Sequence, residues 1–377
     1  MTGLQLLGIC LCLVSVSLVH FGAGGEYPSF CTTFEDKPGW CKHFGECAYF
    51  RDLVTKIKKG LPLTEEETRI KENAGCSTKK TFVCCEEHVN GTGLELLQQS
   101  EEACGKFLRL KVLGGSEIKM GSRPWMALLK YDATEPGTQG RGQFQCGATL
   151  ITKPGFVLTA AHCMINGFPV AVRLGEHNIT SEVDCRIVDS KTSCQLPYED
   201  IGIEKIIPHE GYSRFTQKND IALVKLVRDV VFKDHINPIC LPLYVELQKS
   251  ILETKVMRVT GWGRQTAHGN DSDVPMEAGV SRLPLASCTT MQNRSIAKNQ
   301  ICVSASLQDS CKGDSGGPLL FNFWYKKSKQ RFVQIGIVSY GPENCGHKEL
   351  GETGEGQTSV YTDVTRFIPW ITRTVAQ

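Results

Sequence analysis

Three short stretches place polar side chains in apolar or glycine-rich surroundings, where solvation alone would not explain them. They are LTAAHC around His162, KNDIALVKL around Asp220 and DSCKGDSGGPL around Ser315. A neutral imidazole can take the proton of a serine hydroxyl, and a carboxylate can fix the tautomer of that imidazole and stabilise the cation that forms. Together the three residues predict acyl transfer from an amide through a nucleophilic serine.

Two glycines flank this serine at close spacing. Gly313 and Gly316 allow the backbone to turn sharply. The turn would point the N–H groups of Gly313 and Ser315 at an oxyanion that develops during the reaction. Taken singly the signals are weaker, because His162 is one of nine histidines and Asp220 could simply cap a turn.

The sequence pattern around these residues is typical of a β protein. From Val112 onward short apolar runs such as PWMALLKY, FVLTAAHC and RFVQIGIVSY are broken by Gly, Pro and Asn. Apolar runs interrupted by turn residues predict many short strands arranged as a sandwich or barrel. Only VTRFIPWITRTV at the end is amphipathic enough to predict a helix, with Pro369 tolerated in its first turn.

Length and charge narrow the class of protein. A chain of 377 residues is more than one small core uses, so two units of unequal size are expected. A net charge of +2 does not indicate the strongly basic surface that binds nucleic acid. Residues 1–25 predict a secretory signal peptide, apolar from Leu4 to Val19, whose competing interpretation is a buried helix. The apolar run is short for a membrane helix, which needs roughly 20 residues.

The cysteine count supports an extracellular location. Removing Cys10 and Cys12 with the signal peptide leaves sixteen of the eighteen cysteines. That number is far too high for a reducing compartment and could form eight disulfides. Sequons for N-glycosylation agree with secretion, and they begin at Asn90, Asn178, Asn270 and Asn293.

A small cysteine-rich unit precedes the β domain. Six cysteines, at positions 31, 41, 47, 76, 84 and 85, lie in a stretch with few large apolar residues, so covalent bonds are expected to hold it. Zinc is the alternative, but paired C-x-x-C spacing is missing. Residues 86–111 follow as a linker without a periodic apolar pattern, and they end at Lys111, directly before Val112-Leu113-Gly114-Gly115.

TAAHC, NDIAL and GDSGGPL in that order resemble the trypsin and chymotrypsin family of serine endopeptidases over residues 112–377. The resemblance implies an all-β fold of two six-stranded antiparallel barrels with a C-terminal helix and the active site between the barrels. It also implies a zymogen that is cut after Lys111. The freed ammonium of Val112 would then insert beside Asp314 and order the oxyanion hole. The alternative is that VLGG simply begins a strand.

The same resemblance implies a substrate pocket for Lys or Arg. Asp309 would form its floor and Ser310 would add a hydroxyl, while Ser339 and Gly341 would border the strand that pairs with substrate. Ser359 departs from the family, which normally has glycine there. Either Gly354 or Gly356 replaces that glycine through a shifted loop, or the Ser359 side chain narrows the pocket.

Disulfide pairs are also implied by resemblance. Six cysteines ending in a Cys-Cys pair before a protease resemble the clip domain of arthropod serine proteases, here residues 26–85. The implied pairs are Cys31 with Cys84, Cys41 with Cys76, Cys47 with Cys85, Cys104 with Cys240, Cys146 with Cys163, Cys288 with Cys302 and Cys311 with Cys345. Cys185 and Cys194 remain and would form a disulfide within their own loop.

Catalysis of this kind requires no cofactor. Glu176 and Glu199 bracket the loop of Cys185 and Cys194, where some relatives bind structural calcium. Calcium needs six to eight oxygen ligands, so a solvated acidic loop is the equal alternative.

The clip resemblance implies a role in an extracellular cascade of innate immunity. Such proteases activate prophenoloxidase for melanisation or process a cytokine ligand of Toll. The implied partners are a zymogen or cytokine precursor as substrate, an upstream activating protease and serpin inhibitors, without nucleic acid or membrane. The alternatives are a non-catalytic cofactor or recognition protein on the same scaffold, a developmental cascade protease and a digestive protease.

Overall fold

The computed structural model describes residues 30–32, 38–79, 81–86, 89–107, 116–132, 143–165, 167–188, 190–264, 271–304, 313–325, 329–341 and 358–377. Several expected features lie outside these ranges: the signal peptide, the sequon at Asn270, the cut site at Lys111 and Val112, the pocket residues Asp309 and Ser310, and the pair Cys311 with Cys345. No helix within these ranges is long and apolar enough to cross a bilayer.

The N-terminal unit is a three-stranded sheet with two helices. Its strands are β1 (Phe30–Thr32), β2 (Pro38–His43) and β3 (Phe82–Glu86), and its helices are α1 (Ala48–Lys58) and α2 (Glu65–Asn73). Helix α2 begins with a capping box in which Thr64 and Glu67 satisfy each other's backbone N–H groups. The core is small, with Phe50, Leu53 and Val83 at its centre.

Disulfides compensate for this small core. Cys41 is bonded to Cys76 and Cys47 to Cys85, with S–S distances of 2.05 and 2.09 Å. Cys84 is also disulfide-bonded; the side chain of Cys31, its expected partner, lies outside the described part of the chain. The two described bonds are those that the sequence resemblance implied.

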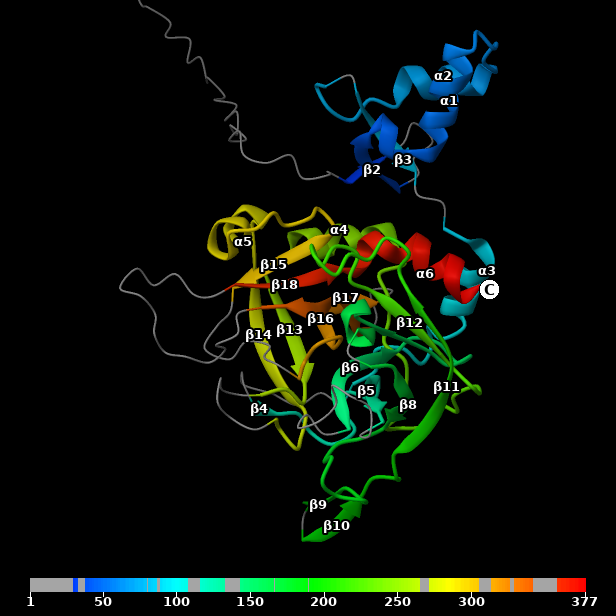
Figure 1. Cartoon of the computed structure of the whole chain (residues 1–377). Coiled ribbons are helices and arrows are strands. Elements are labelled where there is room, and N and C mark those ends of the chain that lie inside the picture. The colour runs from blue at the N-terminus through cyan, green and yellow to red at the C-terminus, as the bar shows by residue number, and fades with distance from the viewer. Residues whose placement is uncertain are drawn as a thin grey trace, which may run out of the picture.

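Two closed antiparallel barrels form the larger unit (Figure 1). The first has the order β11-β12-β7-β6-β5-β8, and pairing of β11 with β8 closes it. Its strands are β5 (Met126–Tyr131), β6 (Phe144–Leu150), β7 (Phe156–Thr159), β8 (Pro169–Leu174), β11 (Glu199–Pro208) and β12 (Ala222–Leu226). A separate hairpin, β9 (Cys185–Val188) and β10 (Lys191–Cys194), projects from it and carries the disulfide of Cys185 with Cys194.

The second barrel has the order β13-β16-β17-β18-β15-β14, closed by pairing of β13 with β14. Its strands are β13 (Val256–Gly261), β14 (Met276–Leu283), β15 (Gln300–Ser304), β16 (Pro318–Tyr325), β17 (Lys329–Tyr340) and β18 (Thr358–Asp363). The short strand β4 (Ser116–Glu117) pairs with the edge of β14. The prediction of two six-stranded barrels is confirmed.

Helices are more numerous than the sequence predicted. The expected C-terminal helix is present as α6 (Ile368–Val375), with its proline in the first turn. Two further helices are present: α4 (Val245–Glu253) lies in the connection between the two barrels, and α5 (Leu285–Gln292) lies between β14 and β15. The expectation of a single helix in this unit was wrong, because these two helices are short and α5 has no clear apolar face.

The segment expected to be a linker contains a helix that docks on the catalytic unit. Helix α3 (Gly91–Gln98) packs against α6, and its Leu97 is buried in the core of the first barrel. The Asn90 side chain caps α3 by accepting from Gly93 N, and Asn90 N donates to Thr372 Oγ1 at 3.1 Å. Further along, the Arg331 guanidinium donates to the carbonyl of Cys104, which is disulfide-bonded to Cys240.

Replacing Gly93 by Ala is expected to lower the melting temperature of the full chain. A Cβ there would lie 1.7 Å from Thr372 O, so α3 would have to move away from α6. Overpacking of this kind typically costs about 1–3 kcal/mol. The matched control is Gly91→Ala, since a Cβ at Gly91 meets nothing within 4 Å. Equal melting temperatures for the two variants would contradict the docking.

Candidate active site

His162 and Asp220 come from different connections of the first barrel and meet directly. His162 lies in a 3-10 turn (Ala161–Met164) after β7, and Asp220 lies shortly before β12. His162 Nδ1 donates to Asp220 Oδ2 at 2.7 Å, and the backbone N of His162 donates to Oδ1 at 2.9 Å. These two bonds fix both the orientation of the imidazole and its tautomer.

Asp220 is fully buried, and two hydroxyls support it from the second barrel. Ser339 Oγ donates to Asp220 Oδ2 at 2.5 Å, and Thr362 Oγ1 donates to the Asp220 carbonyl at 2.7 Å. Ser339 was expected only as part of the strand beside the substrate, and Thr362 was not expected at all. Their sequence separations from Asp220 are 119 and 142 residues, so only the fold brings them there.

The backbone around Ser315 is linked to the segment that carries His162. Gly147 N donates to Ser315 O at 2.8 Å, and Gly147 follows Cys146, which is bonded to Cys163 next to His162. The ring nitrogen of His162 and the sulfur atoms of Cys146 and Cys163 lie within 4.8 Å of one another. Both sulfurs belong to a disulfide, so this cluster is a structural brace and does not have the free thiolates a metal would need.

Ser315 Oγ makes no hydrogen bond to His162 within the described residues. In active sites of this kind the contact between nucleophile and base is often long without substrate and tightens in the complex. The structure shows the pair of His162 and Asp220, and the participation of Ser315 as the nucleophile stays a prediction.

The turn at the nucleophile requires glycine. Gly313 has φ +106° and Gly316 has φ +77°, both in the left-handed region. A Cβ at Gly316 would lie 2.2 Å from Thr159 Oγ1. Within the described ranges the N–H groups of Gly313 and Ser315 have no acceptor. Backbone N–H groups without an acceptor can donate hydrogen bonds to an oxyanion.

Asp314 is buried against two glycines that the sequence analysis did not single out. Its Oδ1 accepts from Gly263 N at 2.8 Å. A Cβ at Gly261 would lie 2.0 Å from Asp314 Oδ1, and one at Gly263 would lie 2.5 Å from Asp314 Cγ. The signal that could have found them is the tripeptide Gly261-Trp262-Gly263 after a strand, since glycine there often marks a close approach of other groups.

Ser359 and Gly341 face each other at the described edge of the expected substrate pocket. Ser359 lies on β18 and is only 1% exposed. Its Oγ lies 2.6 Å from the position that a Cβ of Gly341 would take. The hydroxyl therefore occupies the space beside Gly341, which favours the second of the two interpretations given above for this departure from the family.

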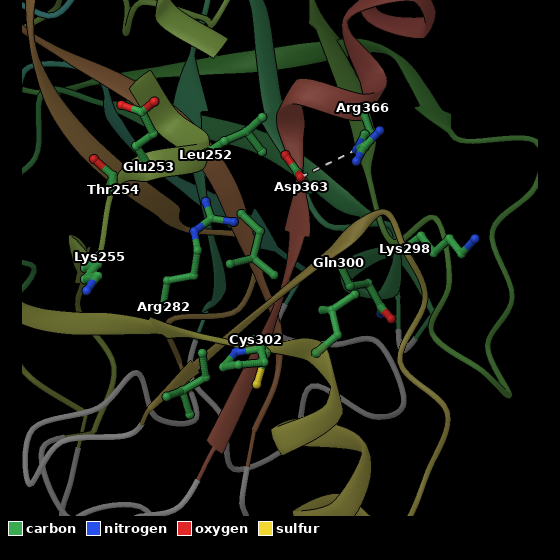
Figure 2. Close-up of a pocket in the computed structure, with 14 residues that line it drawn as sticks. Leu252, Glu253, Thr254, Lys255, Arg282, Lys298, Gln300, Cys302, Asp363 and Arg366 are labelled. Atoms are coloured by element: carbon green, nitrogen blue, oxygen red, sulfur yellow. Dashed lines mark ion pairs between the residues drawn. The ribbon is translucent and has the colours of Figure 1, made fainter. Parts of the chain in front are cut away.

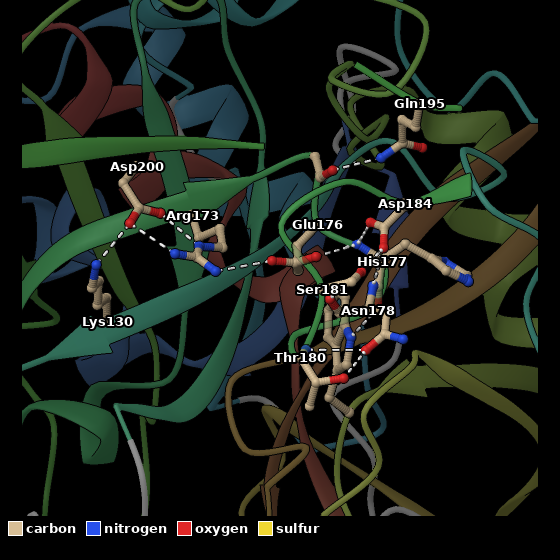
Figure 3. Close-up of polar contacts among 12 residues, drawn as sticks. Lys130, Arg173, Glu176, His177, Asn178, Thr180, Ser181, Asp184, Gln195 and Asp200 are labelled. Atoms are coloured by element: carbon tan, nitrogen blue, oxygen red, sulfur yellow. Dashed lines mark hydrogen bonds and ion pairs between the residues drawn. The ribbon is translucent and has the colours of Figure 1, made fainter. Parts of the chain in front are cut away.

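Both residues expected to bind calcium accept hydrogen bonds from the protein, and Figure 3 shows those of Glu176. Glu176 accepts from Arg173 at Oε2 and from the backbone N of His177 at Oε1. Glu199 accepts from Arg228 and Lys233, one at each oxygen. Calcium binding by these two carboxylates remains a prediction, in which the ion would share their oxygens with Arg173, Arg228 and Lys233.

Two hollows lie among the described residues, apart from the catalytic groups. One, of about 600 Å³, is lined by residues such as Leu252, Arg282 and Arg366 (Figure 2). A second, of about 680 Å³, lies beside the β9–β10 hairpin and is lined by residues such as His177 and Ile187. Neither is lined by His162, Asp220 or Ser315.

The pKa of His162 is raised above its ordinary value of 6.5. Burial alone would lower this pKa, but the charge of Asp220 and the hydrogen bond to it outweigh burial. Only the neutral imidazole can accept a proton, so activity should fall as the pH drops through the raised pKa. The acidic limb of kcat/KM is therefore expected above pH 6.5. In Asp220→Asn the His162 pKa, followed by NMR, should fall; an unchanged value would contradict this cause.

Comparisons with known proteins identify the family of this chain. The family model described as "Trypsin" matches residues 112–371, and the one described as "Regulatory CLIP domain of proteinases" matches residues 31–85. The chain is 36% identical over 364 residues to the serine protease grass of Drosophila melanogaster, covering 94% of this chain and 93% of the relative. It is 32% identical over 395 residues to melanization protease 1 of the same organism, covering 93% and 94%.

A solved structure agrees over almost the whole chain. The crystal structure of the Drosophila Grass clip serine protease of the Toll pathway aligns with a TM-score of 0.67 and 36% identity, covering 93% of this chain and 98% of the other. Family models, full-length relatives and fold lead to one assignment. The chain belongs to the trypsin family and is a clip-domain serine protease.

Proposed function

We propose that this chain is a zymogen that becomes an endopeptidase on cleavage after Lys111 and acts on Lys or Arg bonds in an extracellular cascade of innate immunity. The observation that carries the proposal is the hydrogen-bonded pair of His162 and the buried Asp220 beside Ser315. Full-length relatives named for melanisation and for the Toll pathway support the cascade role.

The residues divide the reaction between them. His162 takes the proton of Ser315 Oγ while that oxygen attacks the peptide carbonyl, and Asp220 stabilises the imidazolium. The N–H groups of Gly313 and Ser315 bind the oxyanion. His162 then returns the proton to the leaving amine, which leaves an acyl group on Ser315. Water, activated by the same imidazole, hydrolyses that ester and regenerates the serine.

The switch rests on one ion pair. In the proposed active form the new ammonium of Val112 lies beside Asp314, whose carboxylate is held against Gly261 and Gly263. Before cleavage this ammonium does not exist. A buried carboxylate that loses its cation typically costs about 3–5 kcal/mol, which is enough to keep the oxyanion hole from ordering.

Specificity in this proposal comes from Asp309 at the pocket floor, with Ser310 beside it and Gly341 at the mouth. A carboxylate at the base of an otherwise uncharged pocket favours cationic side chains. The substrates are a downstream zymogen or a cytokine precursor, the activator is a trypsin-like protease, and serpins are the inhibitors. The chain is proposed to be secreted after removal of residues 1–25, with N-glycans on its sequons.

The test is to cut the purified full chain after Lys111 and measure hydrolysis of peptide amides that end in Lys, Arg, Phe or Ala. Hydrolysis of the Lys and Arg peptides alone is expected, with Ser315→Ala as the inactive control. Candidate plasma zymogens are then incubated with the active enzyme, and the fragments are sequenced from their N-termini. If none of the peptides is hydrolysed, the alternative of a non-catalytic recognition protein would be favoured.

A further inference from the structure

The hollow drawn in Figure 2 combines an apolar wall with a rim of basic side chains. Its volume of about 600 Å³ lies in the range of pockets that bind ligands, roughly 300–1,000 Å³. The wall is formed by the end of α4, the turn from β14 into α5, and β15, and its apolar members are Leu252, Leu283, Pro284, Leu285 and Ile301. An apolar group of a ligand that covers such a wall lowers the free energy of binding.

Basic side chains from four separate segments form the rim. The segments are the connection after α4, strand β14, the connection after α5, and the 3-10 turn (Val364–Phe367) after β18, and the side chains are Lys255, Arg282, Lys298 and Arg366. Lys255 and Lys298 are exposed, and within the described ranges neither takes part in an ion pair. Their charges are therefore accessible to a ligand from outside.

Carboxylates do not balance the rim. The lining contains two, on Glu253 and Asp363, against four cations. Asp363 is buried, and its Oδ1 accepts from the backbone N and from the hydroxyl of Thr365, at 3.0 and 2.5 Å. Its Oδ2 lies 3.9 Å from Arg366 Nε. The rim keeps a net positive charge, which attracts an anionic ligand and orients it.

The positive charge continues onto the clip unit. Lys298 Nζ lies 6.0 Å from the centroid of the Phe82 ring in β3, and Lys79 Nζ lies 5.9 Å from the same centroid. One ring of the clip unit thus has an ammonium group from each unit beside it. The rim of the hollow reaches the clip unit at this point, so a macromolecule in the hollow can contact both units.

We propose that this hollow is a docking site for a protein partner whose acidic segment carries one large apolar side chain. The apolar side chain fills the hollow against Leu252 and Leu283, and the neighbouring carboxylates bind the basic rim. An apolar anchor in a pocket with a polar rim typically supplies much of the affinity of a protein interface. The site is distinct from the catalytic pair, since neither His162 nor Asp220 lines it.

The apolar wall favours a protein over a sulfated polysaccharide. A polysaccharide carries its sulfate groups on a polar chain, so it would bind the rim and leave the wall uncovered. A peptide in extended conformation advances about 3.3 Å per residue and points alternate side chains to opposite faces. A leucine with acidic residues on either side therefore places an apolar group in the hollow and carboxylates at its rim.

The experiment measures the binding of labelled peptides to the full, uncut chain by fluorescence anisotropy. The acidic probe is Glu-Asp-Leu-Glu-Asp and the neutral probe is Gln-Asn-Leu-Gln-Asn, each with the same fluorophore. The acidic probe is expected to bind at least tenfold more tightly, and its affinity should fall with added salt because exposed charges are screened. Replacing its leucine by serine should weaken binding roughly tenfold.

Variants of the chain locate the binding in the hollow. Lys255→Glu combined with Lys298→Glu reverses two rim charges and should weaken the acidic probe at least tenfold. The matched control is Lys153→Glu combined with Lys205→Glu, which changes the net charge equally at exposed lysines of the first barrel and should bind as the wild type does. Leu252 is 43% exposed, so Leu252→Ser is compatible with folding, and it should reduce the difference between the leucine and serine probes.

Equal binding of the acidic and neutral probes, or an equal loss in the control pair of lysines, would overturn the inference. A sulfated hexasaccharide of the heparin type is tested in parallel, and if only this probe binds at the rim, the hollow is a polysaccharide site and the proposal is wrong. The measurement involves no catalysis. A chain that shows the expected binding but cleaves no peptide after Lys111 is cut would overturn the proposed function and leave this inference intact.

Discussion

Replacing Asp220 by Asn is expected to lower kcat of the activated protein by about 10⁴-fold while leaving its fold intact. The buried carboxylate accepts from His162 Nδ1 and from the His162 backbone. An amide at this position would present a donor to the imidazole and stabilise the wrong tautomer, and the imidazolium formed during attack would lose its counter-charge. The measurement is kcat on a Lys peptide, with active sites counted by a serine-directed phosphonate.

Two further variants make this result specific. Asp229→Asn changes an exposed acid on the same barrel and should leave kcat unchanged. Ser339→Ala removes one neutral donor from Asp220 Oδ2 and should cost roughly five- to tenfold, the effect of about 1–1.5 kcal/mol. A value for Asp220→Asn within tenfold of the wild type would mean that Asp220 does not orient the base.

Replacing Gly263 by Ala is expected to lower kcat by about 10²–10³-fold, even after complete cleavage at Lys111. The new Cβ would lie 2.5 Å from Cγ and from Oδ2 of Asp314, so the carboxylate would have to leave its position. The ammonium of Val112 would then lose its partner, and the oxyanion donors of the neighbouring turn would not be aligned. Activity is measured on the cut protein, together with the rate at which an acylating reagent modifies the Val112 amine.

The matched control for this variant is Gly279→Ala on β14, where a Cβ meets nothing within 4 Å and the residue is exposed. Its kcat and its rate of amine modification should match those of the wild type. The amine of the Gly263→Ala protein should be modified faster because it spends more time in solvent. Full activity of Gly263→Ala would show that the position of Asp314 does not govern the oxyanion hole.

The barrels and the pairing of His162 with Asp220 could be predicted because their signals are local. Short apolar runs with turn residues between them specify strands, and the residues around His162, Asp220 and Ser315 carry a recognisable chemistry in a few positions each. The Cys104 and Cys240 pair followed from the family resemblance and is present in the structure.

The supporting residues could not be predicted, because their roles depend on contacts between distant segments. Nothing around Ser339 or Thr362 indicates that they support Asp220 from the other barrel. Helix α3 was missed for a different reason: two glycines in its first turn give it low intrinsic propensity, and its stability comes from packing against α6.

The docking of α3 limits how far the regulatory unit can travel once the chain has been cut. Only residues 87–89 lie between the end of β3 at Glu86 and the helix cap at Asn90. A spacer of three residues spans at most about 11 Å. If the chain is cut after Lys111 as proposed, the disulfide of Cys104 with Cys240 would hold the two pieces together, and the clip unit would stay within this distance of α3. A cofactor that binds the clip unit would hold the catalytic unit close to any substrate bound to the same cofactor. The effective concentration of that substrate at the active site would then be high.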